Sequence, residues 1–240
     1  MLRDLMVGTF YRATATRSDA PSELSGKWLA LSALRRFLRD QRIDTVLDVG
    51  ANCGQFAAKL RRLGFRGTIL SFEPDPRAFA ELTARHQGDP NWRGYPLGLG
   101  DENGMLSFHL AGHSVLSSFL APVRAENVAE VVTIPVKRLD AVLDEALAEA
   151  GVASPRILLK TDTQGYDLHV LRGASGCMGR IAGILAELSV LPIYEGSPSL
   201  TQSLDAYREA GFDLADLSVV NKTPDGRLLE MDGLFVRRPE

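Results

Sequence analysis

The chain has 240 residues, 45% of them hydrophobic and 24% charged, and its formal net charge is −3. This composition is close to that of an average globular protein and excludes a disordered, collagen-like or disulfide-rich chain. The slightly negative charge gives no reason to expect nucleic acid as a partner. The two cysteines lie far apart, which favours a reducing compartment, and no run approaches the roughly 20 apolar residues of a membrane helix. We therefore expect a cytoplasmic protein without a membrane span.

Residues 1–40 are predicted to form a helical cap or arm, and residues 41–240 one α/β domain. Leucine and phenylalanine recur at helical spacing over residues 27–42, which predicts a helix there. A second, short amphipathic pattern near the start consists of Leu2, Leu5, Met6 and Phe10. We expect this pattern to pack on the domain or on a second copy of the chain, as in a homodimer. Contact with a membrane surface is the alternative.

Strands and helices alternate along the rest of the chain. In order, we predict a strand from Asp44 into a glycine-bearing loop, a helix over 56–63, a strand over 68–72, a helix from Pro76 to about His86, a weaker strand over 94–99, strands over 105–110 and 131–136, a helix over 138–150, a strand over 156–162, a helix over 166–172, a strand over 181–188, a helix over 199–210, and a hairpin of 212–220 and 228–237. Such alternation implies right-handed parallel βαβ units.

The most informative stretch is VLDVGANCGQ at residues 46–55. A buried strand ends in Asp48, and a loop with Gly50, Asn52 and Gly54 leads into a helix. Glycine lets the backbone approach a ligand closely, and asparagine tolerates left-handed geometry better than most residues. Open α/β sheets bind ligands at such strand ends. The pattern therefore predicts a ligand-binding loop, with a ligand-free turn as the alternative.

The nature of the ligand follows from two acidic residues. Glu73 ends the next strand, 25 residues after Asp48, where a carboxylate can bind both hydroxyls of a ribose. The dinucleotide fingerprint G-x-G-x-x-G is absent. Because Asp48 precedes the glycines, it can attract an ammonium group, and the loop has no basic residue for a phosphate. The loop therefore suits a cationic nucleoside better than a pyrophosphate.

Four ordered motifs resemble the FkbM-type S-adenosylmethionine-dependent methyltransferases over about residues 40–238. They are DVGANCGQF, FEPDP, LGLGDENGMLSF and LLKTDTQGYDLHVLRGA, and the closing MDGLFVRR is similar to the family's last strand. The resemblance implies an α/β fold of the seven-stranded Rossmann-like (class I) type, mostly parallel with a C-terminal antiparallel hairpin and helices on both faces. Several members of the family methylate hydroxyl groups on sugars or polyketides.

The resemblance also implies roles for matching residues. In the family, the loop at 48–55 holds the methionine part of S-adenosylmethionine, the acid at 73 holds the ribose, and positions 74 and 99 lie near the adenine. The chain departs from the family at Thr163-Gln164, where many members have Val-Glu, so any role for an acid at 164 is open. The implied cofactor-binding residues are Asp48, Gly50, Asn52, Gly54, Gln55, Glu73, Pro74 and Leu99.

A hydroxyl is a poor nucleophile that needs a general base or a metal ion. Asp162 ends the predicted central strand and is the first candidate base, with cofactor contact or helix capping as the alternative. Glu187 lies near the end of the adjacent strand and either takes part in catalysis or makes a structural hydrogen bond. His113, in a small polar loop, is the alternative base or a surface histidine. A divalent metal ion is weighed but not expected, because no dense ligand cluster is present.

Taken together, the sequence predicts an S-adenosylmethionine-dependent O-methyltransferase domain. The acceptor is expected to be a carbohydrate, a glycolipid or a polyketide-like small molecule, and nucleic acid is not expected as a partner. The alternatives are N-methylation of an amine or an RNA base, and a non-catalytic nucleoside-binding scaffold with the same fold.

Overall fold

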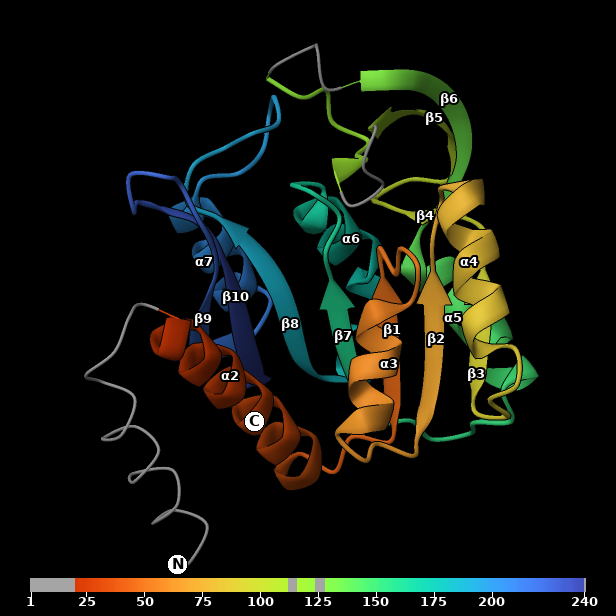
Figure 1. The fold of residues 1–240 in the computed structure, drawn as a ribbon. Coiled ribbons are helices and arrows are strands. Elements are labelled where there is room, and N and C mark those ends of the chain that lie inside the picture. Colours follow the sequence, from red (N-terminus) through yellow and green to blue (C-terminus); the bar gives the residue numbers. More distant parts are fainter. Residues whose placement is uncertain (1–19, 112–115, 124–127, 240) are drawn as a thin grey trace, which may run out of the picture.

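A seven-stranded sheet forms the centre of the computed structural model, which describes residues 20–111, 116–123 and 128–239. Its strands, in spatial order, are β3 (Trp92–Tyr95), β2 (Thr68–Phe72), β1 (Thr45–Val49), β7 (Ile157–Thr161), β8 (Ile181–Ser189), β10 (Leu228–Arg237) and β9 (Phe212–Lys222). The first five are parallel, and β10 runs antiparallel to both of its neighbours (Figure 1). The predicted sheet with its C-terminal hairpin is confirmed.

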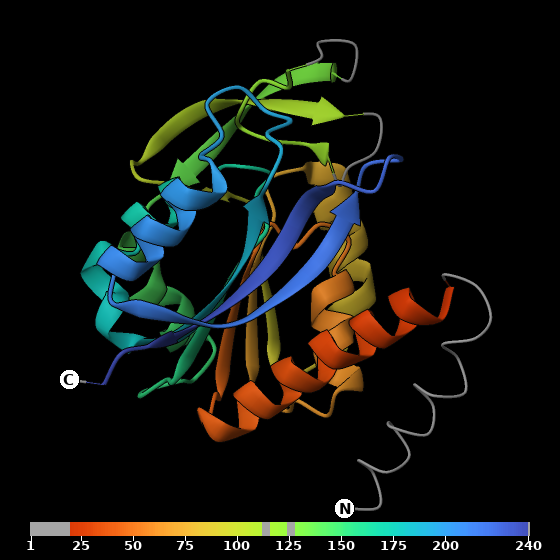
Figure 2. The same cartoon turned by 90° about the vertical axis from the view of Figure 1, so that its left-hand side faces the viewer.

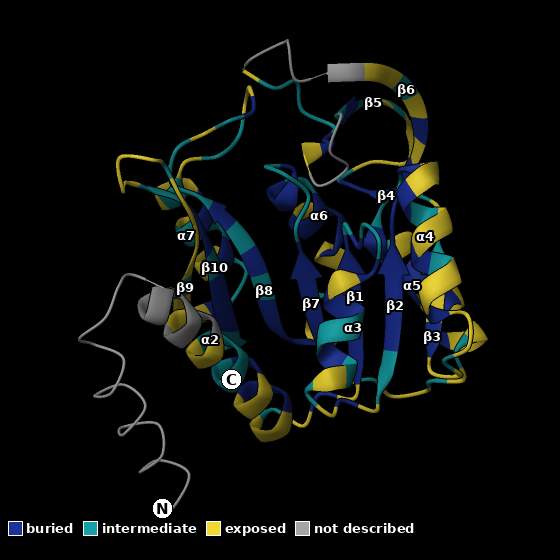
Figure 3. Ribbon diagram, in the orientation of Figure 1, coloured by how far each residue is buried: buried dark blue, intermediate teal, exposed yellow. Residues whose placement is uncertain are grey.

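Helices cover both faces of this sheet (Figures 1 and 2). They are α2 (Ala20–Asp40), α3 (Gln55–Arg62), α4 (Pro76–His86), α5 (Leu139–Glu149), α6 (Asp167–Gly173) and α7 (Leu200–Glu209), with a 3₁₀ helix, η3 (Ser175–Arg180). One apolar core joins α2, α3 and α4 to the sheet, and a second joins α5, α6 and α7 to its other face. All five residues of β1 and of β7 are buried (Figure 3), as expected for central strands of a parallel sheet.

Local signals in the sequence set several helix ends. Asp75 caps α4, because its carboxylate accepts from the backbone N–H of Arg77 at 2.8 Å and Pro76 occupies the first helical position. Ser199 and Gln202 form a reciprocal capping box at the start of α7. These contacts confirm the helix starts expected from the sequence.

A small second sheet lies above the carboxyl-terminal ends of the central strands (Figure 1). It consists of β4 (Gly98–Leu99), β6 (Val128–Lys137) and β5 (Gly104–Ala111). The sequence prediction of one strand over 94–99 was wrong, since the chain leaves the main sheet after β3 and enters the small sheet at β4. Pro96 lies at this break, and proline has no N–H to donate to a sheet.

The first part of the chain is only partly described. Residues 1–19, with the short amphipathic pattern, lie outside the described residues. α2 packs through Leu34, Phe37 and Leu38 into the core beside β1 and β8. The role of residues 1–40 as a cap or dimerising arm stays a prediction. Among the described helices, none combines the length and the apolar character that crossing a bilayer requires.

Candidate active site

A cavity of about 590 Å³ opens at the carboxyl-terminal ends of the central strands. One part of its wall comes from the loops after β1 and β2 and from β4, and another from the loop after β7 and from β8, β9 and β10. The predicted cofactor residues in this wall are Gly50, Asn52, Gln55, Glu73, Pro74 and Leu99, and the predicted catalytic residues in it are Asp162 and Glu187. The fold thus brings both predicted groups to one cavity.

The loop after β1 depends on left-handed backbone conformations. Gly50, Asn52 and Gly54 have φ values of 69°, 47° and 82°, a region that glycine and asparagine adopt at low cost. A Cβ atom on Gly50 would overlap the carbonyl oxygen of Asp162. Gly50 therefore lets the loop after β1 pack directly against the loop after β7, which carries the candidate base.

We expect Gly50→Ala to lower the free energy of unfolding by about 3 kcal/mol, because alanine adds a steric overlap to an unfavourable φ. The matched control is Gly64→Ala, since Gly64 also has a positive φ of 89° but has no atom within 4 Å of a built Cβ. The control should lose only about 1 kcal/mol. Urea unfolding of both variants measures the difference, and equal losses would show that the close approach of the two loops is unimportant.

Glu73 lies at the junction of the loops after β1 and β2. Its carboxylate accepts from the backbone N–H groups of Asn52 at 2.6 Å and Asp75 at 2.8 Å, and the residue is 5% exposed. Burial raises the pKa of this carboxyl to about 7, although both backbone hydrogen bonds act in the opposite direction. Each carboxylate oxygen has two lone pairs, so both can still accept from a ligand hydroxyl.

Asp48 lies beneath the loop rather than in the cavity wall. It is fully buried, and the Lys160 ammonium group lies 3.0 Å from its Oδ1. Lys160 also donates to the carbonyl oxygen of Gly50 at 2.9 Å. Burial alone would lower the pKa of Lys160, but the charges of Asp48 and Asp162 outweigh it and raise that pKa. The contact of Asp48 with a cofactor ammonium group stays a prediction, and its pairing with Lys160 is the observed arrangement.

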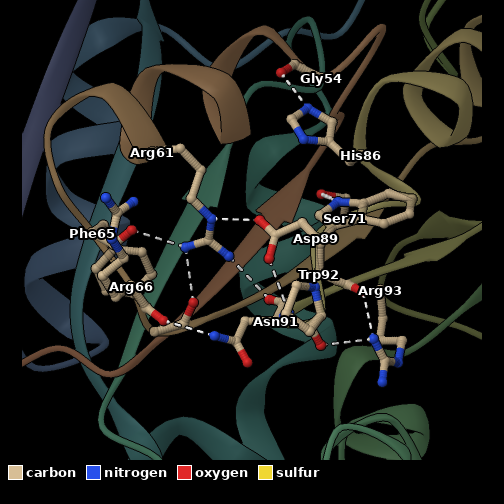
Figure 4. A network of polar contacts seen from close by, with 12 residues as sticks. Gly54, Arg61, Phe65, Arg66, Ser71, His86, Asp89, Asn91, Trp92 and Arg93 are labelled. Atoms are coloured by element: carbon tan, nitrogen blue, oxygen red, sulfur yellow. Dashed lines mark hydrogen bonds and ion pairs between the residues drawn. The ribbon is translucent and has the colours of Figure 1, made fainter.

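Behind the loop, a chain of ring and hydroxyl contacts supports Gly54, which also lies outside the cavity wall. A ring nitrogen of His86 lies 3.0 Å from the Gly54 carbonyl oxygen, and the His86 ring packs against Trp92 (Figure 4). Trp92 donates its indole N–H to Ser71 at 3.0 Å, and Ser71 lies 3.5 Å from Asp48. The helix α4 and the strands β2 and β3 therefore hold the loop from below.

The part of the wall formed by β7 and β8 carries the candidate catalytic groups. The Asp162 side chain is 44% exposed, and the Gln164 amide nitrogen lies 3.3 Å from its Oδ1. The same nitrogen donates to Glu187 Oε2 at 2.8 Å. Burial, followed by the charge of Asp162, raises the pKa of Glu187 far above its usual range. The two acids therefore differ, with Asp162 accessible and Glu187 favouring the neutral form.

The sequence did not point to Lys160 or His86 as residues of this site, and it marked Gln164 only as a departure from the family. The position of Lys160 within the buried strand β7 was a signal that it pairs with an acid, since a buried charge needs a partner. No pattern indicated that His86 reaches the loop after β1, or that Gln164 joins the two acids. His113, the alternative base, lies outside the described residues. Within the described ranges, no three His, Cys, Asp or Glu residues are grouped so that they could hold a metal ion.

Known proteins resemble this chain over most of its length. The Methyltransferase FkbM domain matches residues 48–214. The chain is 27% identical over 169 residues to the 2-O-methyltransferase NoeI of Sinorhizobium fredii, which covers 67% of this chain and 69% of that protein. It is 26% identical over 158 residues to the hexuronic acid methyltransferase AglP of Haloferax volcanii, covering 65% of this chain and 60% of that protein.

Solved structures show the same fold. The magnesium protoporphyrin IX methyltransferase ChlM of Synechocystis, solved with bound S-adenosylmethionine, superposes with a TM-score of 0.50 at 9% identity. The match covers 95% of this chain and 88% of that one. The FkbM domain accounts for well over half of the residues, and it includes the loop after β1, Glu73 and the two acids at the cavity. The chain therefore belongs to the FkbM methyltransferase family and is an S-adenosylmethionine-dependent methyltransferase.

Proposed function

We propose that this methyltransferase acts on a hydroxyl group of a carbohydrate, free or as part of a glycan or glycolipid. The observation that carries the proposal is the accessible carboxylate of Asp162 in the cavity wall, next to Gln164 and Glu187. Methylation of a hydroxyl needs a proton acceptor at the reacting oxygen. NoeI and AglP, whose names describe 2-O-methylation and hexuronic acid methylation, add support at 27% and 26% identity.

The residues of the cavity fit S-adenosylmethionine. The volume of about 590 Å³ lies within the usual range for small-molecule sites. Glu73 would accept from the two ribose hydroxyls, and Pro74 and Leu99 would flank the adenine. The loop with Gly50, Asn52 and Gln55 would hold the methionine part. The cofactor supplies a methyl group on a sulfonium, which is an electrophile.

The protein's own contribution is to align the acceptor and to take its proton. With the cofactor bound, the cavity would hold the acceptor oxygen in line with the methyl group, which would pass to that oxygen while the electron pair of the broken carbon–sulfur bond would stay on sulfur. The hydroxyl proton passes to the Asp162 carboxylate. In-line geometry at the methyl carbon makes positioning a large part of the rate. Glu187 favours the neutral form, which makes it less suited than Asp162 to accept a proton.

The raised pKa of Glu73 gives the proposed ribose contact a pH dependence. Ribose hydroxyls donate to the ionised carboxylate, so S-adenosylhomocysteine should bind more tightly as the pH rises through about 7. In the absence of ligand, Glu73 affects the stability of the folded protein in the opposite direction with pH. The carboxyl has an ordinary pKa of 4.5 and a folded pKa of about 7, so the folded state binds more protons between these values and its stability falls as the pH rises.

We expect isothermal titration with S-adenosylhomocysteine to give an affinity that rises about fivefold or more from pH 6 to pH 8 for the wild type. Glu73→Gln should bind at least about tenfold more weakly, a loss of about 1.4 kcal/mol, with a flat profile over the same range. Glu81→Gln is the matched control, because Glu81 is an exposed carboxylate in α4 and does not line the cavity. A Glu73→Gln variant with wild-type affinity would exclude the ribose contact.

Transfer of a ¹³C-labelled methyl group tests the whole proposal. The enzyme is incubated with labelled S-adenosylmethionine and a panel of methyl glycosides, amines and short RNAs, and the products are identified by NMR. A methyl ether on a sugar oxygen is the expected product. Methylation confined to amines or RNA bases would favour an N-methyltransferase. Tight cofactor binding with no transfer to any acceptor would favour a non-catalytic scaffold.

A further inference from the structure

Gln164 is held in place through both its backbone and its side chain. Its φ of 54° is in the left-handed region, and Gly165 follows with a φ of 89°. Ser118, which lies beside the small sheet, donates its hydroxyl to the Gln164 carbonyl oxygen at 2.9 Å. A Cβ atom on Gly165 would overlap the Ser197 hydroxyl. The hydrogen bond from Ser118 and the close packing at Gly165 therefore fix the backbone position from which the Gln164 side chain extends.

The far end of the side chain is oriented by a tyrosine. The Tyr194 hydroxyl donates to Gln164 Oε1 at 2.9 Å and also lies 2.9 Å from the Leu116 carbonyl oxygen. Burial raises the pKa of Tyr194, so the hydroxyl keeps its proton over the neutral range. With Oε1 facing Tyr194, the amide nitrogen must face the other way. There it donates to Glu187 Oε2 at 2.8 Å and lies 3.3 Å from Asp162 Oδ1.

The charges around Glu187 explain why an amide suits this position. Asp162 follows β7, Asp167 is in α6, and Glu230 and Asp232 are in β10, and all four raise the pKa of Glu187. Asp232 is the cross-strand partner of Glu187. Lys160 and Lys59 are cations that face these acids, Lys160 toward Glu187 and both toward Asp232. A carboxylate at 164 would add a further negative charge, whereas the amide adds two N–H donors and no charge.

We propose that Gln164 is a positioning residue that gives the carboxyl groups of Asp162 and Glu187 different tasks, an inference that rests on the proposed function. Its amide holds Asp162 as the ionised group that accepts the acceptor's hydroxyl proton. It holds Glu187 through Oε2, so that a proton on Oε1 can donate a hydrogen bond to a neighbouring acceptor oxygen. Such a pair recognises two adjacent oxygen atoms of the acceptor: a hydroxyl that donates its proton to Asp162, and an oxygen that accepts a hydrogen bond from Glu187. A vicinal diol of a sugar ring has this arrangement.

Two variants separate the charge of this residue from its hydrogen bonds. Gln164→Glu adds a charge at nearly constant shape, and Tyr194→Phe leaves the amide without the donor that orients it. The matched controls are Gln87→Glu, an exposed position beyond the end of α4, and Tyr95→Phe, whose hydroxyl donates to Glu149 outside the cavity wall. All variants are studied as the full chain loaded with S-adenosylhomocysteine, whose affinity should stay within twofold of the wild type.

The first readout needs no acceptor. Carbon-13 labelling of the carboxyl groups, with Glu187→Gln and Asp162→Asn for assignment, gives both titrations by NMR. In the wild type, Glu187 should remain protonated at pH 7. Gln164→Glu should raise the titration midpoint of Asp162 by about one pH unit or more, and Gln87→Glu should leave it unchanged. A Glu187 that titrates near 4.5, or an Asp162 that Gln164→Glu leaves unmoved, would overturn the proposal.

The second readout is the rate of methyl transfer to the sugar acceptor. Tyr194→Phe should lower kcat about tenfold or more with an unchanged KM for S-adenosylmethionine, and Tyr95→Phe should lower neither. In Gln164→Glu the acidic limb of the kcat profile should move to higher pH, as the NMR titration does. An unchanged kcat in Tyr194→Phe would contradict the positioning role. Full activity of Asp162→Asn would instead refute the proposed base, independently of how Gln164 affects the two titrations.

Discussion

Asp162→Asn is expected to lower kcat for methyl transfer by about 10²–10⁴-fold, which is the usual contribution of a general base. The substitution keeps the shape of the side chain and removes its ability to accept a proton. Asp162 is accessible from the cavity and lies next to the Gly50 loop, so the loss should appear in the chemical step. The affinity for S-adenosylhomocysteine, measured by isothermal titration, should stay within twofold of the wild type.

Asp213→Asn is the matched control for this variant, because Asp213 is an exposed carboxylate at the start of β9, near Arg238. It should change neither kcat nor cofactor affinity. If Asp162→Asn loses cofactor affinity in proportion to its activity, Asp162 is a cofactor contact and another group takes the proton. His113, the other candidate base, would then be the residue to replace next.

Lys160→Met is expected to destabilise the protein by about 3–5 kcal/mol, the usual loss when one partner of a buried ion pair is removed. Lys160 and Asp48 have side chains that are 7% and 0% exposed, with 3.0 Å between charged atoms. Methionine fills a similar volume but leaves the Asp48 charge buried without its cation. Urea unfolding at pH 7 measures the loss directly.

The double variant Asp48→Asn/Lys160→Met separates charge from packing. It removes both charges, so it should recover most of the stability that Lys160→Met loses. A double variant that is as unstable as the single one would show that Lys160 acts through its packing or through its bond to the Gly50 carbonyl oxygen.

The parts of the fold that the sequence predicted are those encoded by neighbouring residues. The strand–loop–helix at 46–55, the Asp75-Pro76 helix start and the C-terminal hairpin all depend on signals within a few positions. The break between β3 and β4 was missed, because the choice of sheet partner is a long-range contact that local propensity does not encode.

The candidate site was predictable as a place, but the pairing of its groups was not. Strand ends with Asp48, Glu73 and Asp162 indicated a common edge of the sheet. That Lys160 lies opposite Asp48 depends on the register between β1 and β7. Likewise, the amide of Gln164 reaches Glu187 only because β8 lies beside β7. Both contacts join residues at least 23 positions apart, and no local pattern predicts them.

A crystal structure with S-adenosylhomocysteine is the most direct test of where the cofactor binds in this cavity relative to Asp162. The ribose hydroxyls should lie within hydrogen-bond distance of Glu73, the adenine should pack against Leu99, and the sulfur should face the side of the cavity that carries Asp162. Asp162 should make no contact with the amino acid part of the ligand. An Asp162 carboxylate bound to the ligand's ammonium group, or a ribose away from Glu73, would contradict this binding mode.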